Sequence, residues 1–389
     1  MLLKGARIAL NSSQAVHSDL WIRNGVVSFL PVPIERTLTL CLDECIIVPG
    51  LINAHDHLEL NLFPRLGHGP YANASAWAQD IYRPRESPVK EHLSVPKGLR
   101  LTWGAIKNLL SGVTTVAHHN PFHSIFLEPD FPVRVVRRYG WAHSIHFSPD
   151  WHTRLERTPV DCPFLIHAAE GTDEAARSEI STLGNAGALR QSTILVHGVG
   201  VNASGLARIQ RAGAGVVWCP TSNHFTLGRS LQPAVFDAGI SVALGNDSAM
   251  TAQGDLLDEL RFAHQTVSAE RLYAMVTSEP ARMLKLPAGF GRISPNDPAD
   301  LLVMKDTGLS PAMTLLETHP QLVILNGQIQ LISSDLASAL PTNLLRSFQQ
   351  VEIEGRGTYL FAAPVATMLK QTTENLRQSP RLAGKAMAA

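Results

Sequence analysis

Five polar residues of this sequence are of the types, and stand at the positions, that could hold a metal ion and move protons. His55 and His57 form a His-x-His pair directly after an apolar run, and His167, His197 and Asp247 each close a further apolar run. Side chains at positions i and i+2 of a strand share one face, so both imidazoles of the pair point the same way if a strand continues through them. Imidazole nitrogens and carboxylate oxygens suit Zn²⁺ or Fe²⁺, and three histidines with one aspartate leave a position for water.

The segments that must position these side chains alternate between strand and helix. Apolar, strand-like runs lie at 46–48 with 51–52, and at 113–116, 164–166, 193–196, 216–218 and 242–244. Helical patterns occupy 174–183, 205–212, 231–238 and 256–266. This alternation across residues 51–290 predicts a (β/α)8-type TIM barrel, in which the carboxyl ends of the strands converge on one mouth. An isolated His-x-His pair is more often a hydrogen-bonded loop feature; the other strand-end residues favour the metal site here.

Two regions depart from the barrel pattern. If residues 141–147 form the third strand, the segment 147–161 is too short for helix, strand and helix, so the barrel is expected to be abbreviated or distorted near strand 4. Both chain ends show short strands, with Asn24-Gly25 as a strong hairpin signal. We therefore expect a composite β-sandwich domain from 1–50 and 291–355, the barrel at 51–290, and a C-terminal helical tail at 356–389.

The overall composition argues against several classes of partner. The 389 residues include 33 basic and 33 acidic side chains, so no net field favours nucleic acid or an anionic membrane. The 45% apolar fraction is enough for a substantial core. The four cysteines are too few for a disulfide framework, and there is neither a secretory leader nor an apolar stretch of about 18 residues. We expect a soluble cytoplasmic protein that takes a small-molecule substrate, and a homodimer is left open.

Taken in order, the motifs of this chain resemble those of the amidohydrolase superfamily. The similar branch contains cytosine and guanine deaminases, S-adenosylhomocysteine deaminase and the triazine hydrolases, and the resemblance covers nearly the whole chain. The motifs that carry it lie at 49–57, 111–116, 167–170, 219–223, 238–248, 277–282 and 298–303.

This resemblance implies a role for each polar residue at the predicted mouth. The implied metal ligands are His55, His57, His167 and Asp247. Glu170 is implied to be a proton shuttle. His197 is implied to be an acid/base partner of the reaction rather than a ligand, and Asp247 shares that work.

The positions of the lysines in the sequence limit the number of metal ions that the predicted site can hold. Two-metal members of the superfamily need a bridging carboxylated lysine, or a glutamate, from a barrel strand. No lysine occurs between Lys107 and Lys285, so the barrel from the second strand onward lacks the carbamate. Glu128 and Glu156 could replace it only from poorly defined segments. We therefore expect one divalent ion, with Zn²⁺ favoured and Fe²⁺ as the alternative.

The predicted reaction is hydrolytic deamination of an amino-substituted N-heterocycle. A bound divalent ion lowers the pKa of water from about 15.7 to roughly 7, which provides the nucleophile. Hydrolysis of an amide, imine or carbon–halogen bond is the alternative. A barrel that binds metal without catalysis is an alternative from another class, and the presence of Glu170 and His197 argues against it.

Five residues are predicted to contact the substrate. His118 and His119 follow the second strand, and the alternation does not decide which of them faces the cavity. Asn223 and Arg65 occupy positions at which family members touch substrate, and Trp77 is placed to stack on a flat ring. A solvated arginine and a core tryptophan are the competing interpretations.

Overall fold

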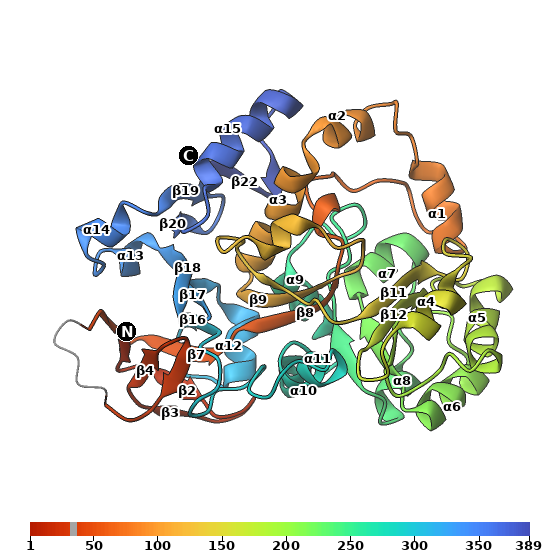
Figure 1. Ribbon diagram of the computed structural model, residues 1–389, viewed down its shortest axis with the longest axis horizontal. Coiled ribbons are helices and arrows are strands. Elements are labelled where there is room, and N and C mark those ends of the chain that lie inside the picture. The colour runs from red at the N-terminus through yellow and green to blue at the C-terminus, as the bar shows by residue number, and fades with distance from the viewer. Residues whose placement is uncertain (32–36) are drawn as a thin grey trace.

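The computed structural model describes residues 1–31 and 37–389. In this part of the chain eight strands form a barrel (Figure 1): β8 (Leu51–Asp56), β9 (Val113–His118), β10 (Arg134–Val135), β11 (Gly140–Ser144), β12 (Phe164–Ala168), β13 (Thr193–His197), β14 (Gly215–Trp218) and β15 (Val242–Leu244). Paired neighbours run parallel. The amides of Asn246 and Asp247 donate to the carbonyl of His55 and so join the end of β15 to β8. The predicted barrel is confirmed.

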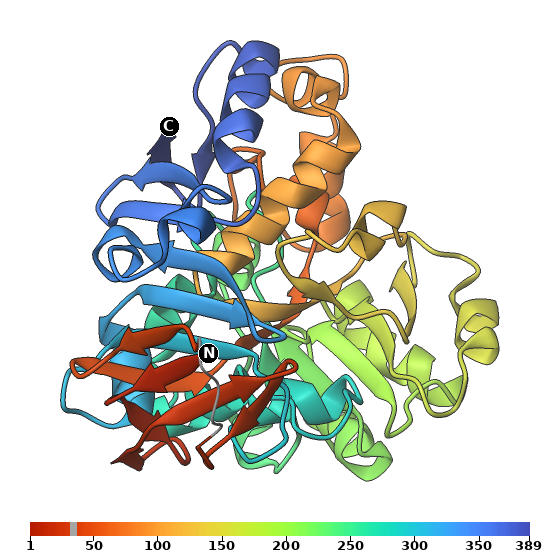
Figure 2. The ribbon, with the colours of Figure 1, turned by 60° about the vertical axis from the view of Figure 1, so that its left-hand side comes forward.

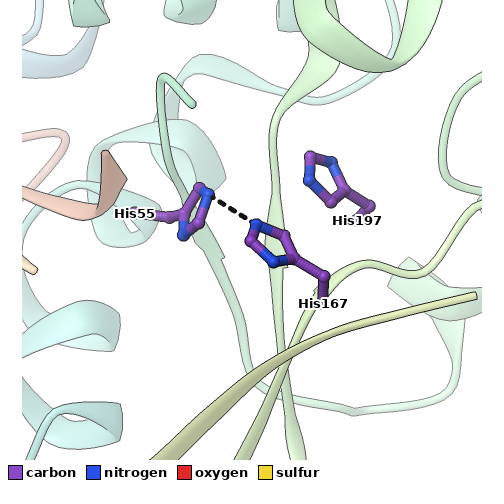
Figure 3. Close-up of side chains that lie close together, drawn as sticks. All are labelled: His55, His167 and His197. Carbon is purple, nitrogen blue, oxygen red and sulfur yellow. Dashed lines mark hydrogen bonds between the residues drawn. The ribbon is translucent and has the colours of Figure 1, made fainter. Parts of the chain in front are cut away.

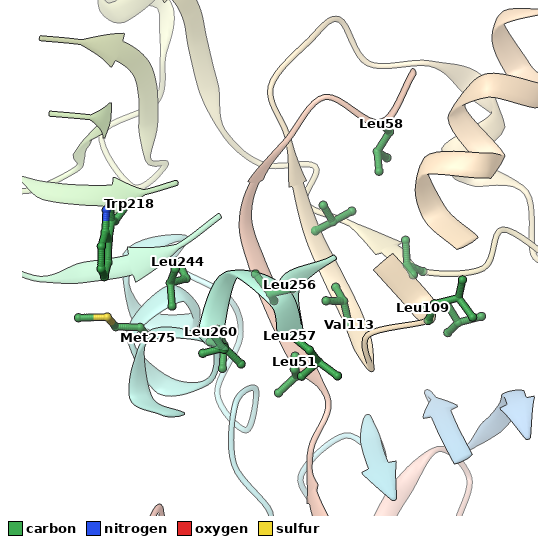
Figure 4. Packing of buried hydrophobic residues seen from close by; sticks show 14 of the residues in the cluster. Leu51, Leu58, Leu109, Val113, Trp218, Leu244, Leu256, Leu257, Leu260 and Met275 are labelled. Atoms are coloured by element: carbon green, nitrogen blue, oxygen red, sulfur yellow. The ribbon is translucent and has the colours of Figure 1, made fainter. Parts of the chain in front are cut away.

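Helices cover the outside of the barrel: α3 (Lys97–Leu109), α4 (Trp151–Arg157), α5 (Glu174–Asn185), α6 (Ala203–Ala212), α7 (Pro220–Leu227), α8 (Pro233–Asp237), α9 (Leu256–Ala263), α10 (Ala269–Met275) and α11 (Ser278–Met283). Gly213 ends α6 with a φ of 68°, a left-handed conformation that glycine adopts without steric cost. Leu257 and Leu260 of α9 belong to the same core cluster as Leu51 of β8 (Figure 4). Among the described helices, none is long and apolar enough to cross a membrane.

The third strand of the barrel is abbreviated. Residues 141–147 begin in β11, which is the fourth strand, and the third strand is β10, with only two residues. Residues 136–139 join these strands, so no helix fits between them. In the described part of the chain β10 pairs with β9 and β11 pairs with β12, but no pairing joins β10 to β11. The segment 147–161 therefore needs to hold only α4. The distortion lies at the short third strand and at the break between it and the fourth, which agrees with the predicted distortion near strand 4.

The long connection after β8 contributes the elements above the mouth of the barrel. It contains the short 3-10 helix η1 (Leu58–Leu60) and the helices α1 (Ala74–Ile81) and α2 (Val89–Ser94), and η2 (Ser124–Leu127) follows β9. Asn73 caps α1, because its side chain accepts the amide hydrogen of Ala76. Its Nδ2 donates to Asp173 Oδ2 at 2.6 Å, and Asp173 in turn caps α5. The two N-caps thus tie α1 to the helix that follows β12.

Strands from both chain ends form a β part beside the barrel (Figure 2). One sheet has the order β5-β4-β1-β6 and the other β21-β22-β19-β20-β18-β17-β16-β7-β2-β3. The strands are β1 (Leu2–Lys4), β2 (Arg7–Ala9), β3 (Ala15–His17), β4 (Leu20–Arg23), β5 (Val26–Ser28), β6 (Thr39–Cys41), β7 (Cys45–Pro49), β16 (Leu301–Lys305), β17 (Pro320–Leu325), β18 (Gln328–Ser333), β19 (Gln349–Ile353), β20 (Gly357–Phe361), β21 (Arg381–Leu382) and β22 (Lys385–Ala388). The two ends meet where β16 pairs antiparallel with β7. Asn24 and Gly25 have φ values of 52° and 78°, as the predicted hairpin turn requires.

The final segment of the chain also joins the larger sheet. Residues 356–389, expected as a helical tail, contain α15 (Val365–Leu376) together with β20, β21 and β22. Trp103 Nε1 of α3 donates to Thr372 Oγ1 of α15 at 2.7 Å, which docks the helix on the barrel. Three short helices connect the strands of this part: α12 (Pro311–Glu317), α13 (Ser334–Ala337) and α14 (Thr342–Leu345).

Candidate active site

Three barrel strands end in residues with a left-handed backbone. Ala169, His197 and Asp247 have φ values of 53°, 75° and 60°. Residues with a Cβ pay roughly 1–2 kcal/mol for this conformation, so neighbouring contacts must hold it. The amide of Gly198 donates to Ala168 O, and the amide of Asp247 donates to His55 O. Strain of this kind concentrates at functional sites, and here it occurs where the predicted polar side chains stand.

Four donor atoms converge at the mouth of the barrel. His55 Nε2 lies 3.3 Å from His167 Nε2. The Nε2 atoms of His55 and His57 each lie 3.6 Å from Asp247 Oδ1. Figure 3 shows the rings of His55 and His167 facing each other. We call these four buried residues, His55, His57, His167 and Asp247, the metal-donor set.

The hydrogen bonds of the imidazoles test whether a metal ion fits. His167 Nδ1 donates to the carbonyl of His143 at 2.6 Å, so its Nε2 presents a lone pair. His55 Nδ1 faces His119 at 3.2 Å, which leaves Nε2 of His55 turned to His167. Burial lowers the pKa of His55, and those of His57 and His167 well below the usual value, so the rings are neutral at pH 7. Lone pairs and a carboxylate oxygen at these distances repel one another unless a cation lies between them. The donor set therefore fits a divalent ion such as zinc.

The carboxylate of Asp247 is held by its second oxygen. Oδ2 accepts hydrogen bonds from Ser222 Oγ at 2.6 Å and from Thr251 Oγ1 at 2.8 Å. Oδ1 is thus left free to face the metal position.

Glu170 and His197 form a pair of facing side chains beside this position. His197 Nδ1 donates to Asn223 Oδ1 at 2.7 Å, so its Nε2 faces Glu170 Oε1 at 3.4 Å. Burial raises the pKa of Glu170 to about 7, Asp247 and Glu179 add to the rise, and His197 opposes it. A carboxyl group with a pKa near neutrality can both give and accept a proton at pH 7. Ligand atoms of His197, His55 and His167 also lie within 4.8 Å of one another, which places the pair next to the metal-donor set.

A cavity of about 300 Å³, here called the inner cavity, opens onto the metal-donor set and onto Glu170 and His197. Trp77 and Ala78 of α1 line it. Trp77 therefore lies where it could contact a bound substrate, and the predicted contact itself stays a prediction. A second cavity of about 440 Å³, the outer cavity, shares Ala74, His143, Phe147, His167 and Glu170 with the inner one. Its remaining lining is mostly polar and includes Asn73, Ser75, His146, Ser178, Glu179 and Thr182.

Seven lining residues of the inner cavity were not predicted as site residues: Leu60, Ala74, Ala78, Asn120, His143, Phe147 and Ser248. His143 is the most notable, because its ring centroid lies 4.6 Å from that of His167 and its buried Nδ1 has no hydrogen-bond partner. His143 belongs to β11 and His146 lies three residues further on, a spacing that does not decide which of the two faces the inner cavity. Ser248 directly follows Asp247, so its position in the sequence was a usable signal.

Several predicted substrate contacts lie outside the inner cavity. His118 is buried beside Glu59, with 3.6 Å between Nε2 and Oε2, and His119 lies behind His55. Asn223 lies behind His197. Arg65 is exposed, and its guanidinium lies over the ring of Phe225, 4.5 Å from the centroid. None of these four lines the inner cavity.

The residues that bear on a bridging ligand for a second ion are engaged elsewhere or exposed. Lys107 is buried in α3, and its Nζ donates to Asn61 Oδ1 at 2.8 Å. Glu128 and Glu156 are exposed, and among the described residues neither belongs to a group of His, Cys, Asp and Glu side chains that could hold a metal ion.

Comparison with known proteins identifies the family. Residues 150–330 match the model of the amidohydrolase family. A 5-methylthioadenosine/S-adenosylhomocysteine deaminase of Haloarcula marismortui is 30% identical over 322 residues, which cover 67% of this chain and 72% of that protein.

Two solved structures share the fold across the chain. A zinc-bound adenosine deaminase of Xanthomonas campestris has a TM-score of 0.72 at 17% identity, covering 97% of this chain and 98% of that one. Atrazine chlorohydrolase of Arthrobacter aurescens, complexed with zinc, has a TM-score of 0.72 at 17% identity, covering 96% and 99%. The family match and the relative of Haloarcula marismortui show that this chain belongs to the amidohydrolase family, in a branch that includes deaminases, and it is a hydrolase.

Proposed function

We propose that the protein is a deaminase with one catalytic metal ion, acting on an amino-substituted N-heterocycle, and that a 6-aminopurine nucleoside is the favoured class of substrate. The observation that carries the proposal is the Glu170–His197 pair, 3.4 Å apart, beside the metal-donor set and at the inner cavity. A site that only held a metal would need neither residue. Their joint placement favours proton transfer to and from a bound substrate.

The metal-donor set would hold one divalent ion. When bound, the ion supplies a water of lowered pKa as the nucleophile. We propose zinc, because three imidazoles and one carboxylate suit it, and Fe²⁺ is the alternative. The exposure of Glu128 and Glu156 and the hydrogen bond of Lys107 to Asn61 support a single ion.

The side chains of the site would move the protons of the reaction. Asp247 and the Nε2 lone pair of His197 orient the attacking water and accept its proton. Glu170, whose pKa is raised to about 7, gives a proton to the ring nitrogen next to the amino-bearing carbon, which makes that carbon more electrophilic. The oxygen of the water ends as the ring carbonyl oxygen. The amino group leaves as ammonia after it receives a proton through the same pair.

The two connected cavities favour a substrate larger than a single base. The inner cavity of about 300 Å³ has room for a heterocyclic ring, with Trp77 and Phe147 in its wall. The outer cavity is lined by polar side chains such as His146, Ser178 and Thr182, and the hydroxyl oxygens of Ser178 and Thr182 can accept hydrogen bonds from a sugar. A relative named 5-methylthioadenosine/S-adenosylhomocysteine deaminase and a structure named adenosine deaminase support the same class of substrate.

Ammonia release tests the proposal. The zinc-loaded protein is incubated with a panel of aminopurine nucleosides, free aminopurines, aminopyrimidines, pterins and aminotriazines, and ammonia is measured. We expect release from a 6-aminopurine nucleoside, and faster release than from the free base, because only the nucleoside fills the outer cavity. Chloride release from a chlorotriazine, or product from an amide, in place of ammonia would support the alternative hydrolases. Bound zinc without turnover of any compound would support a binding protein.

Two further expectations from the sequence stay proposals. A location in the cytoplasm and assembly into a homodimer can be examined by cell fractionation and by light scattering of the purified protein.

A further inference from the structure

His119 has both ring nitrogens engaged in the interior of the protein. Its Nε2 lies 2.9 Å from the carbonyl oxygen of Ala142 in β11, and its Nδ1 lies 3.2 Å from Nδ1 of His55. The ring is fully buried and stacks on that of His167 at 4.4 Å between centroids. His119 therefore connects the end of β9 with β11 across the short third strand.

The direction of these hydrogen bonds follows from elementary chemistry. A carbonyl oxygen only accepts, so Nε2 of His119 carries the hydrogen. The ring is fully buried and packed against the imidazoles of His55 and His167, an environment that disfavours a charge, so Nδ1 is an acceptor. His55 must then donate from its own Nδ1, and its Nε2 is left with the lone pair that faces His167 and Asp247.

The backbone of β11 makes this arrangement possible. The pairing of β11 with β12 shifts register between Ala142 and Ser144, as at a β-bulge. Successive carbonyls of a regular strand point in opposite directions, and a bulge relaxes that alternation. Here the carbonyl of Ala142 accepts from His119, and the carbonyl of His143 accepts from His167 at 2.6 Å. The carbonyl of His143 thus accepts directly from His167, a member of the metal-donor set. The preceding carbonyl, that of Ala142, acts on a second member, His55, through His119.

We propose that His119 is a positioning residue that fixes the Nδ1–H tautomer and the ring orientation of His55, and thereby prepares Nε2 of His55 to bind the metal. The inference rests on the proposed metal site. It assigns to His119 a function in metal affinity, not a contact with substrate.

Paired substitutions test the proposal by metal affinity. Zinc affinity is measured on folded protein by competition with a chromophoric chelator. We expect His119→Leu to weaken zinc binding about 10- to 100-fold, the usual effect of removing a partner of a ligating histidine. His119→Asn should restore most of the affinity, because the side-chain oxygen of asparagine can accept the hydrogen of His55 Nδ1. His118→Leu is the matched control: this neighbouring, equally buried ring points to Glu59, and its loss should lower thermal stability while the affinity for zinc is kept.

Three results would overturn the proposal: unchanged affinity in His119→Leu, equal losses in His119→Asn and His119→Leu, or the same loss in His118→Leu. A second measurement needs no variant. Nitrogen-15 NMR of the metal-free wild-type protein should show His55 with hydrogen on Nδ1, and hydrogen on Nε2 would refute the inference even if His119→Leu does not fold. The NMR measurement reads the tautomer of His55 without metal or substrate, so its result does not depend on the proposed function. The proposed function fails separately, if the wild-type protein binds no metal.

Discussion

Asp247→Asn is expected to lower turnover by about 10²- to 10⁴-fold and to reduce the metal retained after dialysis. The Oδ1 atom of Asp247 is the only anionic donor in the metal-donor set, and it lies 3.6 Å from two imidazole nitrogens. Asparagine keeps the shape and can still bond to Ser222 and Thr251, but it removes the charge that helps to hold the ion. Loss of several kcal/mol of stabilisation from the metal corresponds to this range of rates.

Asp237→Asn is the matched control for this prediction. Asp237 is exposed at the end of α8, so the same change in charge should leave metal content and turnover as in the wild-type protein. Measurements of bound metal by elemental analysis and of ammonia release on both variants give the comparison. An Asp247→Asn protein that keeps its metal and its rate would remove Asp247 from the proposed site.

Glu170→Gln should lower turnover by about 10²- to 10⁴-fold while the metal content stays unchanged. Glutamine fills the same space beside His197, but it cannot give or accept a proton at neutral pH. Glu170 is outside the metal-donor set, so this variant separates proton transfer from metal binding. Substrate binding, followed as KM, should change by much less than kcat.

Glu174→Gln provides the control for the charge change alone. Glu174 lies in the first turn of α5, and its side chain is 85% exposed, so its replacement should leave kcat within experimental error of the wild-type value. If Glu170→Gln turned over as fast as Glu174→Gln, another group would have to carry the proton.

Much of the fold was predictable because most barrel strands are apolar runs, and several of these runs lead into a polar residue. His55, His167, His197 and Asp247 all stand at such ends, and the convergence of parallel strands brings them to one mouth. That geometry follows from the topology, and therefore the location of the site could be predicted without coordinates. The left-handed φ of His197 and of Asp247 gave no signal in the sequence, because neither residue type requires it.

The third strand shows where pattern analysis failed. β10 has two residues, too few for a recognisable apolar run, so β11 was counted as the third strand. His143, which lies at the inner cavity and offers its backbone carbonyl to His167, was not among the predicted site residues, because its spacing of three residues from His146 does not decide which of the two faces the cavity. The strands after residue 356 were missed for a related reason, since β21 and β22 are short and rich in small or charged residues.

The direction of the side chains beyond the strand ends is the other feature that could not be predicted from the sequence. His118 and His119 were both candidates for the cavity, yet one points to Glu59 and the other to His55. Asn223 was expected near the substrate and instead accepts from His197. Spacing along the chain does not reveal whether a polar residue touches the substrate or the residue behind it, because that choice depends on packing between distant segments.

Titration of the metal-free protein with zinc tests the central claim most directly. The rate of ammonia release from a 6-aminopurine nucleoside is measured as zinc is added in known amounts. A deaminase with one catalytic ion should gain activity in proportion to the zinc added and reach its full rate at one ion per chain. Full activity before any zinc is added, or a rate that continues to rise up to two ions per chain, would contradict the account.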